Sequence, residues 1–406
     1  MANKVIWYIS KYASTPSNHI VNRQFNFSKN FVKKGCDVYL FSSYSCGHQT
    51  DLAGYDENRR YYYKELLGVH HILIKGPYVD LGMNVKRIIS WIIFEWNLWL
   101  IVRKLKAPMP DTIIVSSLSI LSVLNGFFFK RKFKSKFVFE VRDIWPQTLI
   151  DIGGFSKWNP VILILRSIEK FGYRNADVIV GTMPKLDSHI RNSINQTFEF
   201  KWIPTGVDLE QFEDIPLAES VACQIPTDKF LVGYTGAIGN VNCVDEIVDA
   251  ANILKDNKKI HFLILGDGPL KKEMMQRALN LKNVTFIHKI DKKYVNSFLK
   301  KCSVLLHPVM SRSIYNYGIS PNKWIDYMIS GKPIIVSYDG YQSLINEANC
   351  GVFIPAQNPI LLAAEIKKFS KYPQSALDEM GNAGQKFVKE VLNYSYLADK
   401  YLEVLS

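Results

Sequence analysis

Residues 317–335 read Y-G-I-S-P-N-K-W-I-D-Y-M-I-S-G-K-P-I-I, and this stretch decides the fold. Ser320 and Pro321 predict the start of a helix, because a serine hydroxyl can cap free backbone N–H groups and proline is tolerated at the first helical position. Gly331 predicts the end of that helix in a left-handed conformation, and Pro333 cannot continue it. The apolar residues that follow predict a strand.

The first turn of this predicted helix carries Lys323. Free N–H groups and the helix dipole attract an anion there, and the lysine adds a full positive charge. Asn322 and Asp326 share its face, because residues three and four apart are neighbours on a helix. A carboxylate one turn behind a phosphate site can accept hydrogen bonds from sugar hydroxyls. The segment therefore reads either as a nucleotide diphosphate pocket or as an ordinary capped helix with a surface Lys–Asp pair.

Short runs of β-branched and aromatic residues alternate with helical stretches, which predicts parallel sheets with crossover helices. In the first half we expect strands at residues 5–10, 37–42, 71–75, 112–116, 137–141, 178–181 and 201–204. In the second half we expect them at 230–234, 261–265, 284–288, 304–308, 333–337 and 352–355. The repeated α/β pattern predicts two domains with a ligand cleft between the carboxyl ends of their strands.

The length and charge of the chain fit this division. A chain of 406 residues suits two domains of about 200 residues each. Residues 1–200 contain 27 Lys/Arg and 15 Asp/Glu, so this half carries most of the net charge of +13. We therefore expect an acidic partner to meet the first half.

The six cysteines are scattered and none forms a C-x-x-C pair, so neither a zinc site nor a redox pair is indicated. We expect reduced thiols in a cytoplasmic protein. The apolar run at the N-terminus is too short for a signal peptide and indicates a first strand instead.

Residues 87–106 form an apolar segment with three tryptophans, interrupted by Glu95 and Asn97 and flanked by basic residues. It is too short to be expected to span a bilayer, but it suits a helix at a membrane interface. Residues 127–136 add a second basic and aromatic patch. The alternative is a core helix packed on the first sheet. No recognised nucleic-acid motif accompanies the basic residues, so nucleic acid is not an expected partner.

Polar residues follow two strands of the first half. His19 and Arg23 lie one turn apart near the start of a helix expected at residues 20–33, where they could bind a substrate, although His19 could equally be a solvated turn residue. Arg142 and Asp143 follow the strand at 137–141 and precede Trp145. Charged residues at a carboxyl strand end are candidates for function, but these two could also simply pair with each other.

Glycine turns and one histidine mark the strand ends of the second half. The strand from residue 230 ends in a glycine turn that is not G-x-G-x-x-G, so the dinucleotide fingerprint is absent. A helix is expected to begin at Asn242, with Asp245 three residues later as in a capping box. The candidate residues at these strand ends are Gly236, Gly239, Gly266, Asp267, Gly268 and His307.

Several of these segments, in this order, resemble the family 4 glycosyltransferases. Residues 203–208 read I-P-T-G-V-D and resemble the family's I-P-N-G-V-D, with Thr205 in place of Asn. Residues 266–269 match G-D-G-P, residues 331–333 match G-K-P, and residues 351–355 match the last α/β unit. The resemblance implies an α/β GT-B fold of two facing, doubly wound Rossmann-like domains with a central cleft. The implied domains are residues 1–212, completed by a crossing helix at 392–406, and residues 213–391.

The chain departs from the family at two places. The family usually has two glutamates separated by seven residues, and here those positions hold Gly318 and Asp326. The family usually has Arg and Lys after the first glycine turn, and here Asn240 and Asn242 lie there. The departures place more weight on Lys323 as the cation that holds a diphosphate.

The resemblance implies transfer of a sugar from a UDP-sugar to an acceptor hydroxyl, with retention of the anomeric configuration. Lys323 would stabilise the leaving diphosphate, Asp326 would hold the ribose, and the glycines 236 and 239 would let the backbone approach the diphosphate. The implied donor-binding residues are Gly236, Gly239, Gly266, Asp267, Gly268, His307, Ser320, Asn322, Lys323 and Asp326. No D-x-D triplet occurs, so a metal that bridges the diphosphate is not expected, and the resemblance implies no cofactor.

On the acceptor side the resemblance implies roles for residues of the first half. The implied catalytic residues are His19, Arg142, Asp143 and Lys323, and the implied acceptor-binding residues are His19, Arg23 and Trp145. The segments 142–146 and 320–323 resemble a sub-branch that builds O-antigen and capsule and includes N-acetyl-L-fucosamine transferases.

The acceptor would be a saccharide on a polyprenyl diphosphate, and the protein would lie peripherally on the anionic inner face of the bacterial cytoplasmic membrane. The alternatives are a UDP-sugar epimerase of the same fold and a non-catalytic protein that binds sugar nucleotides.

Overall fold

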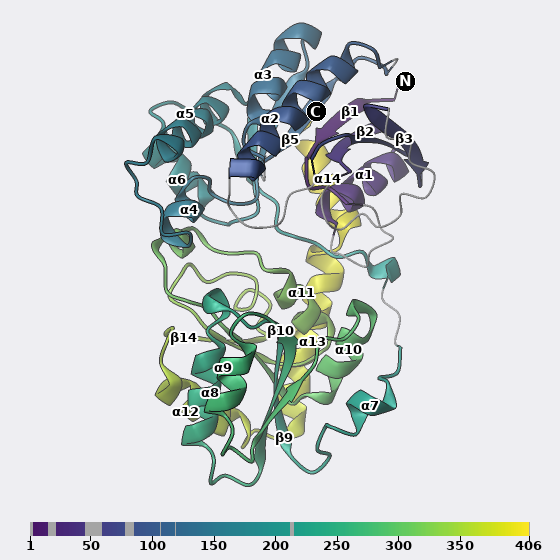
Figure 1. Ribbon diagram of the computed structural model, residues 1–406. Coiled ribbons are helices and arrows are strands. Elements are labelled where there is room, and N and C mark those ends of the chain that lie inside the picture. Colours follow the sequence, from purple (N-terminus) through teal and green to yellow (C-terminus); the bar gives the residue numbers. More distant parts are fainter. Residues whose placement is uncertain are drawn as a thin grey trace. The chain divides into compact units, whose positions relative to one another are not determined.

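A computed structural model describes residues 3–14, 22–44, 59–77, 85–105, 107–117, 119–211 and 215–405. The chain forms two compact units (Figure 1). The first contains Met1–Thr205 and Tyr394–Ser406, and the second contains Gly206–Asn393. The divisions therefore lie at 205/206 and 393/394, whereas the sequence predicted 212/213 and 391/392.

The first unit is built on an eight-stranded sheet in the order β3-β4-β2-β1-β5-β6-β7-β8. All neighbouring strands are parallel except β3 and β4, which are antiparallel. The strands are β1 Val5–Ile9, β2 Asp37–Ser43, β3 Tyr61–Leu66, β4 Val69–Ile74, β5 Thr112–Ser116, β6 Lys136–Val141, β7 Val178–Gly181 and β8 Phe200–Trp202. Central strands such as β5 are buried along their whole length, as expected for a sheet covered on both faces.

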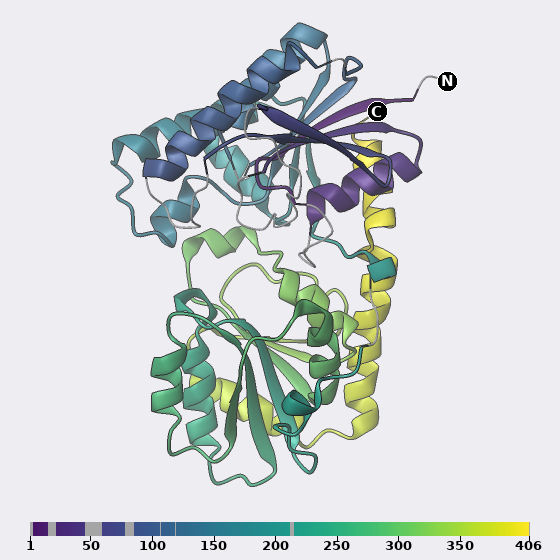
Figure 2. The same ribbon diagram turned by 45° about the vertical axis from the view of Figure 1, so that its right-hand side comes forward.

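Helices cover both faces of this sheet (Figure 2). They are α1 Arg23–Lys33, α2 Val85–Val102, α3 Ser122–Phe133, α4 Gln147–Asp151, α5 Pro160–Asn175, α6 Leu186–Ser193 and α14 Tyr394–Glu403. Ile6 and Tyr8 of β1 pack in one cluster with α1 and α14. Trp7 points to the opposite face, where its ring meets Phe129 and Phe133 of α3. This alternation is the two-residue period of a strand.

Strand β3 was not predicted from the sequence. It forms an antiparallel hairpin with β4 through Leu67 and Gly68, which both have positive φ angles of 51° and 75°. Its residues are partly or fully exposed, so the run lacks the apolar alternation that identifies a strand. The other strands occur where the sequence predicts them, with their ends shifted by up to three residues.

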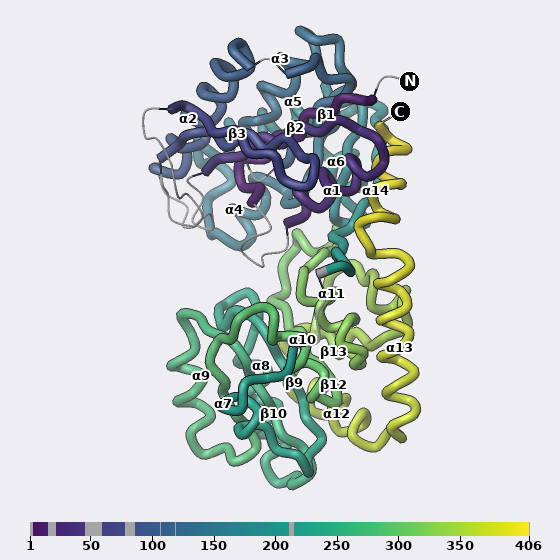
Figure 3. Tube along the Cα trace, turned by 90° about the vertical axis from the view of Figure 1, so that its right-hand side faces the viewer, coloured from purple at the N-terminus to yellow at the C-terminus, as the bar shows by residue number. Residues whose placement is uncertain are grey.

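The second unit has a fully parallel six-stranded sheet in the order β11-β10-β9-β12-β13-β14. Its strands are β9 Phe230–Ala237, β10 Ile260–Asp267, β11 Val284–Ile287, β12 Val304–Pro308, β13 Ile334–Ser337 and β14 Gly351–Ile354. Its helices are α7 Glu219–Ala222, α8 Val244–Ile253, α9 Lys271–Arg277, α10 Lys292–Lys301, α11 Asn322–Ile329, α12 Pro359–Phe369 and α13 Gln374–Val391. Apolar residues of α8, α9 and α12 form one core with the sheet, while α11 packs against α10 and α13 (Figure 3).

The last helix, α14, belongs to the first unit although the residues before it belong to the second. Tyr394 and Tyr401 of α14 lie edge to face against Phe27 of α1, with ring centroids 5.0 and 5.1 Å apart. The sequence predicted a helix of this kind returning to the first domain, starting slightly earlier, at residue 392.

Candidate functional site

Helix α11 begins one residue later than the sequence predicted. Pro321 occupies the N-cap position with an extended ψ of 136°, so Asn322 is the first helical residue and the predicted side-chain cap from Ser320 is wrong. The carbonyl of Pro321 accepts from the Trp324 N–H at 3.1 Å. At the other end Gly331 follows the helix with a φ of +71°, as predicted.

The start of α11 is fixed against the carboxyl ends of β9 and β12. Trp324 is buried and donates from Nε1 to Nδ1 of His307 in β12 at 2.8 Å. The Tyr327 hydroxyl, also buried, accepts from the Thr235 N–H of β9 at 2.9 Å. These two contacts hold the first turn of the helix at the carboxyl edge of the sheet, where ligands of such sheets bind.

Lys323 reaches from this first turn to the end of β9. Its Nζ lies 3.2 Å from Oδ1 of Asn242 and 3.3 Å from the hydroxyl of Tyr234, and 4.4 Å from the centre of the Tyr234 ring. A Cβ at Gly236 would lie 2.9 Å from the same Nζ, and Gly236 has a φ of +144°. Glycine at 236 therefore leaves open the space that the ammonium group occupies, and the φ of this residue favours glycine.

The charge of Lys323 is not neutralised by a directly bonded acid. In the described part of the chain no carboxylate lies within ion-pair distance of it, and its hydrogen-bond partners are neutral. Burial lowers its pKa to about 7, and the charge of Asp326 offsets only part of this effect. A partly buried ammonium without a counter-ion is a favourable site for an anion, because the anion would restore the stability of the charged form.

His307 provides a second donor beside this lysine. Burial and the charge of Lys323 lower the pKa of His307 well below its usual value, so the ring is neutral at physiological pH. Because Nδ1 accepts from Trp324, the proton lies on Nε2. No other hydrogen bond to this imidazole occurs among the described residues. His307 can therefore donate one hydrogen bond without adding charge.

Asp326 lies on the same helix, and its side chain is partly buried. It forms an ion pair with Lys292 of α10. Burial raises the pKa of Asp326, while Lys292 and Lys323 act in the opposite direction. Asn322, the third residue predicted on this face, is exposed. The ion pair with Lys292 was not anticipated, and it orients the carboxylate that the sequence assigns to a ribose.

Two of the predicted glycines are required by backbone packing within the second unit. A Cβ at Gly266 would lie 1.9 Å from the carbonyl oxygen of Gly236, and one at Gly268 would lie 2.3 Å from that of Ile238. Both have a φ of +157°. Asp267, between them, accepts from the N–H of Gly268 at 2.8 Å and so stabilises its own turn. This turn shapes the neighbouring loop after β9.

Gly239 differs from these glycines. No atom lies within 4 Å of a Cβ built there, and its φ of −149° is open to any residue. The structure therefore gives no packing reason for glycine at 239, and the close approach of the backbone at this residue to a diphosphate remains a prediction.

Sequence reasoning missed the partners of Lys323. Asn242 was expected to begin a helix, but Cys243 is the N-cap of α8, with a φ of 38°, and Val244 is the first helical residue. The side chain of Asn242 instead donates to the carbonyl of Ala237 at 3.0 Å and accepts from Lys323. The only available signal was its position directly after the glycine turn, where the family usually has a cation.

At the carboxyl edge of the first unit, Arg142 and Asp143 follow β6. The Arg142 N–H donates to Oγ of Ser117 at 2.9 Å. Among the described residues there is no ion pair between Arg142 and Asp143, although both Arg142 and Arg87 act to lower the pKa of Asp143 against the raising effect of burial. The structure therefore does not favour the interpretation that the two simply pair with each other.

Trp145 is buried beside these residues, and its ring lies edge to face against Trp91 of α2, 5.5 Å away. Its Nε1 is buried without a hydrogen-bond partner among the described residues. A buried donor without a partner costs free energy, so a ligand acceptor at this position would stabilise it.

The expectation that Arg23 binds an acceptor is corrected by the structure. Arg23 is 1% exposed, and its Nε donates to Glu140 at 2.8 Å. Its other nitrogens donate to the carbonyls of Ile203 and Pro204. Burial would raise the pKa of Glu140, but the charges of Arg23 and Arg142 outweigh it and the pKa is lowered. Arg23 is a buried structural cation.

The start of α1 also differs from the prediction. The helix begins at Arg23, because Asn22 is the N-cap and its side chain accepts from the N–H of Phe25 at 3.3 Å. His19 lies outside the described residues.

Comparison with known families places the site in context. Residues 218–387 match the family described as Glycosyl transferases group 1. WbjE of Pseudomonas aeruginosa, named as a probable glycosyltransferase, is 23% identical over 60% of this chain and 62% of its own length. WcaI of Escherichia coli strain K12, named as a glycosyl transferase of colanic acid biosynthesis, is 19% identical over 58% of this chain and 57% of its own. The matches thus span less than two thirds of these relatives.

Solved structures resemble the whole chain. Sucrose-phosphate synthase from Thermosynechococcus elongatus has a TM-score of 0.76 at 17% identity, covering 99% of this chain and 98% of that one. HepE of Anabaena in complex with UDP and glucose has a TM-score of 0.67 at 12% identity, covering 98% of each chain. At these identities the likeness establishes the fold. Residues 218–387 therefore match the Glycosyl transferases group 1 family, and the chain shares the GT-B fold of these solved structures.

Proposed function

We propose that the protein is a glycosyltransferase that moves a sugar from a UDP-sugar to a saccharide carried on a polyprenyl diphosphate, during synthesis of a bacterial O-antigen or capsule. The group 1 domain in residues 218–387 supports the reaction class. The name of WcaI supports a role in polysaccharide synthesis, and UDP in the HepE complex supports the donor nucleotide. The proposed transfer retains the anomeric configuration and needs no metal.

One observation carries this proposal, namely the uncompensated ammonium of Lys323 at the carboxyl edge of the second sheet. The bond between the sugar and UDP breaks with negative charge developing on the diphosphate oxygen. Lys323 and the free N–H groups of the first turn of α11 would stabilise that charge. His307 would add a neutral donor from Nε2. Glycine at 236 leaves the space that the ammonium occupies.

The sugar-binding part of the proposal uses Asp326, Asn322 and Ser320. Asp326 would accept hydrogen bonds from the ribose hydroxyls, and its pair with Lys292 would hold the carboxylate ionised and oriented. Exposed Asn322 and the partly buried Ser320 would contact the remainder of the donor. We propose N-acetyl-L-fucosamine as the transferred sugar, on the resemblance of residues 142–146 and 320–323 to transferases of that sugar.

The acceptor part of the proposal uses Arg142, Asp143, Trp145 and His19. The Trp145 Nε1 donor without a partner supports a polar ligand beside β6. Asp143, with a raised pKa, would accept a hydrogen bond from the attacking hydroxyl. Because the proposed acceptor is lipid-linked, the protein would work at the anionic inner face of the cytoplasmic membrane. Among the described helices none has the length and apolar character to cross a membrane.

The proposal is tested by measuring thermal stability against a panel of nucleotides and nucleotide sugars, since a ligand that binds the native state raises the melting temperature. UDP and one UDP-sugar are expected to raise it more than ADP, GDP or CMP. Turnover is then measured with that donor and a lipid-linked acceptor, with and without a chelator, and the chelator is expected to have no effect. Conversion of the donor alone to an isomeric UDP-sugar would instead show an epimerase. UDP binding without turnover on any lipid-linked acceptor would favour a non-catalytic binding protein.

A further inference from the structure

A band of exposed apolar side chains crosses three helices of the first unit. The band consists of Ile92 and Trp96 of α2, Leu124 and Phe128 of α3, Trp158 in the segment just before α5, and Ile164 of α5. Trp96 is 62% exposed and Trp158 is 73% exposed. Contact between large apolar side chains and water is unfavourable, and a contiguous patch of such side chains marks an interaction site.

Ring contacts link the three helices that carry the band. The rings of Trp96 and Trp99 are stacked with centroids 5.6 Å apart, and Trp99 lies 6.4 Å from Phe128 of α3. Phe127 of α3 in turn meets Phe171 of α5 edge to face at 4.9 Å. Helix α3 contacts both α2 and α5 along the same face of the sheet.

Core packing does not explain these residues. Helix α2 already buries Trp91, Phe94 and Leu98 against the unit. Ile92 and Trp96 point outward on the opposite side of the helix. The sequence left open whether this helix is a core element or an interfacial one, and its two faces fit both descriptions.

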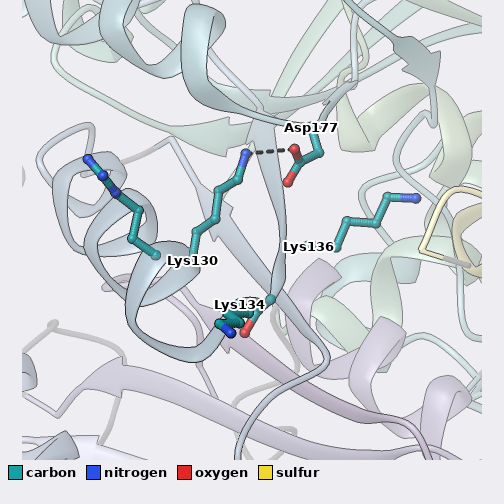
Figure 4. Close-up of a pocket in the computed structure, with 6 residues that line it drawn as sticks. Lys130, Lys134, Lys136 and Asp177 are labelled. Carbon is teal, nitrogen blue, oxygen red and sulfur yellow. Dashed lines mark hydrogen bonds and ion pairs between the residues drawn. The ribbon is translucent and has the colours of Figure 1, made fainter.

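Basic residues adjoin the band. The Arg103 guanidinium stacks on the Trp99 ring at 3.8 Å, just beyond the end of α2. At the end of α3, a pocket is lined by Lys130, Arg131, Lys134, Ser135, Lys136 and Asp177 (Figure 4). Its single carboxylate, Asp177, pairs with Lys130 at 2.6 Å, and the exposed Arg131 and Lys134 add further positive charge to the lining. The pocket therefore favours an anion.

The direction of the helices places the apolar and the basic residues of this face toward different edges of the sheet. Each of these helices connects two parallel strands, so its first turns lie at the carboxyl edge of the sheet and its last turns at the amino edge. The apolar band occupies the first and middle turns, whereas Arg103 and the basic pocket lie at the last turns. Arg142 and Asp143, which follow β6, lie at the same edge as the first turns.

We propose that this outer face of α2, α3 and α5 docks on an anionic lipid bilayer, with the apolar band inserted at the acyl boundary and the basic pocket holding headgroup phosphates. The proposal rests on the proposed function, since it supplies the surface from which a lipid-linked acceptor would be presented. Interfacial binding combines buried apolar area with attraction between basic residues and anionic lipids, and this face offers both.

The test is sedimentation of the full chain with vesicles of phosphatidylcholine alone or mixed with phosphatidylglycerol. The variant Trp96→Ser/Phe128→Ser/Ile164→Ser is expected to lose binding to mixed vesicles by roughly tenfold or more. The variant Arg131→Glu/Lys134→Glu, which changes two residues of the basic pocket, is expected to lose binding to mixed vesicles by a similar factor at low salt and to show little change in high salt, where the charges are screened.

Matched controls come from the second unit. Leu279 and Ile360 are 80% and 71% exposed, so Leu279→Ser/Ile360→Ser removes comparable apolar surface away from the proposed face. Lys255→Glu/Lys258→Glu makes the same change of charge on exposed lysines. Both controls are expected to sediment like the unchanged protein. Melting temperatures of all variants identify any that fail to fold.

Equal losses in the variants and in their controls would overturn the proposal, as would an unchanged protein that ignores anionic vesicles. A dimer that dissociates when the apolar band is changed, without vesicle binding, would assign the face to self-association. UDP titrations on the same proteins separate this test from the proposed function. Loss of vesicle binding with UDP affinity retained concerns the docking face alone, whereas vesicle binding without UDP affinity would count against the donor site.

Discussion

Lys323 is the residue on which the candidate donor site depends, because its charge is held by a tyrosine hydroxyl and an amide rather than by an acid. The first-turn position was evident from the sequence. The neutral partners were not, since Tyr234 and Asn242 are distant from Lys323 along the chain.

Replacing Lys323 tests the site directly. Lys323→Ala is expected to weaken UDP binding by about 1.5–3 kcal/mol, the range for a hydrogen bond to a charged group. Lys301→Ala, at an exposed position in the neighbouring α10, is the control and is expected to bind UDP normally. Isothermal titration measures both. An unchanged affinity in Lys323→Ala would remove the basis of the donor site.

The pKa of Lys323 also predicts a pH dependence. In the free protein this pKa is about 7, and a bound diphosphate would raise it, so binding above pH 7 takes up a proton. UDP affinity is therefore expected to fall as pH rises above 7, by up to about tenfold per pH unit. Lys323→Arg stays charged throughout and is expected to lose this dependence. Equal slopes for the two proteins would assign the titration to another group.

Arg23 shows that the position of a residue along a predicted helix does not tell whether its side chain is exposed to a ligand. Residues 23–31 of α1 are all buried, so the helix has no exposed side on which an arginine could meet a ligand. Its sequence contains many polar residues and gives no sign of this burial. The polar residues of α1 serve interior contacts, such as the pair between Arg23 and Glu140.

Arg23→Ala is expected to destabilise the protein by roughly 3–5 kcal/mol, because it leaves the carboxylate of Glu140 buried without its partner. The double variant Arg23→Met/Glu140→Gln is expected to recover part of that loss. Urea denaturation measures both free energies of unfolding. A double variant that is no more stable than Arg23→Ala would show that packing of the arginine, rather than charge compensation, accounts for the loss.

Among the structural elements, the turn after β10 shows how a glycine motif can serve packing. Gly266 lies against the carbonyl of Gly236 in β9, beside the Lys323 ammonium, and Gly268 lies against the carbonyl of Ile238 in the loop that follows β9. The G-D-G-P segment therefore supports the candidate site by packing against the end of the neighbouring strand β9. The sequence identified the turn, but it could not distinguish contact with a ligand from contact with a neighbouring loop.

Gly266→Ala is expected to destabilise the second unit by more than about 2 kcal/mol, because both a positive φ and a backbone clash oppose the new Cβ. Gly239→Ala meets no atom within 4 Å and is expected to fold normally. Thermal unfolding compares the two. A reduced UDP affinity in Gly239→Ala at unchanged stability would support close approach of the diphosphate there.

At the scale of the whole molecule, the first unit is completed by residues from the end of the chain. Helix α14 covers Phe27 and Phe31 of α1, and Tyr401 contacts both rings. Lys4 also donates to the carbonyl of Leu405, so the two ends of the chain meet in one unit. A rule that assigns domains by continuous stretches of sequence misses this arrangement.

Truncation after Asn393 is therefore expected to destabilise the first unit and to leave the core of the second intact. Removing α14 exposes the aromatic face of α1, and exposed aromatic surface of this kind promotes aggregation. Calorimetry is expected to show loss of one unfolding transition, while the core of the second unit remains protected from proteolysis. A truncated protein with unchanged unfolding would show that α14 contributes little.

Local patterns determined the α/β class, nearly all the strands and the lysine in the first turn of α11, because apolar periodicity, glycine turns and proline stops depend on residues close in sequence. Only the tertiary structure decided that Asn242 holds Lys323 across 81 positions, that Lys292 pairs with Asp326 across 34, and that Arg23 pairs with Glu140 across 117. These contacts arise when strands far apart in the chain become neighbours in a sheet. The site is therefore a product of the order of the strands, which no local pattern contains.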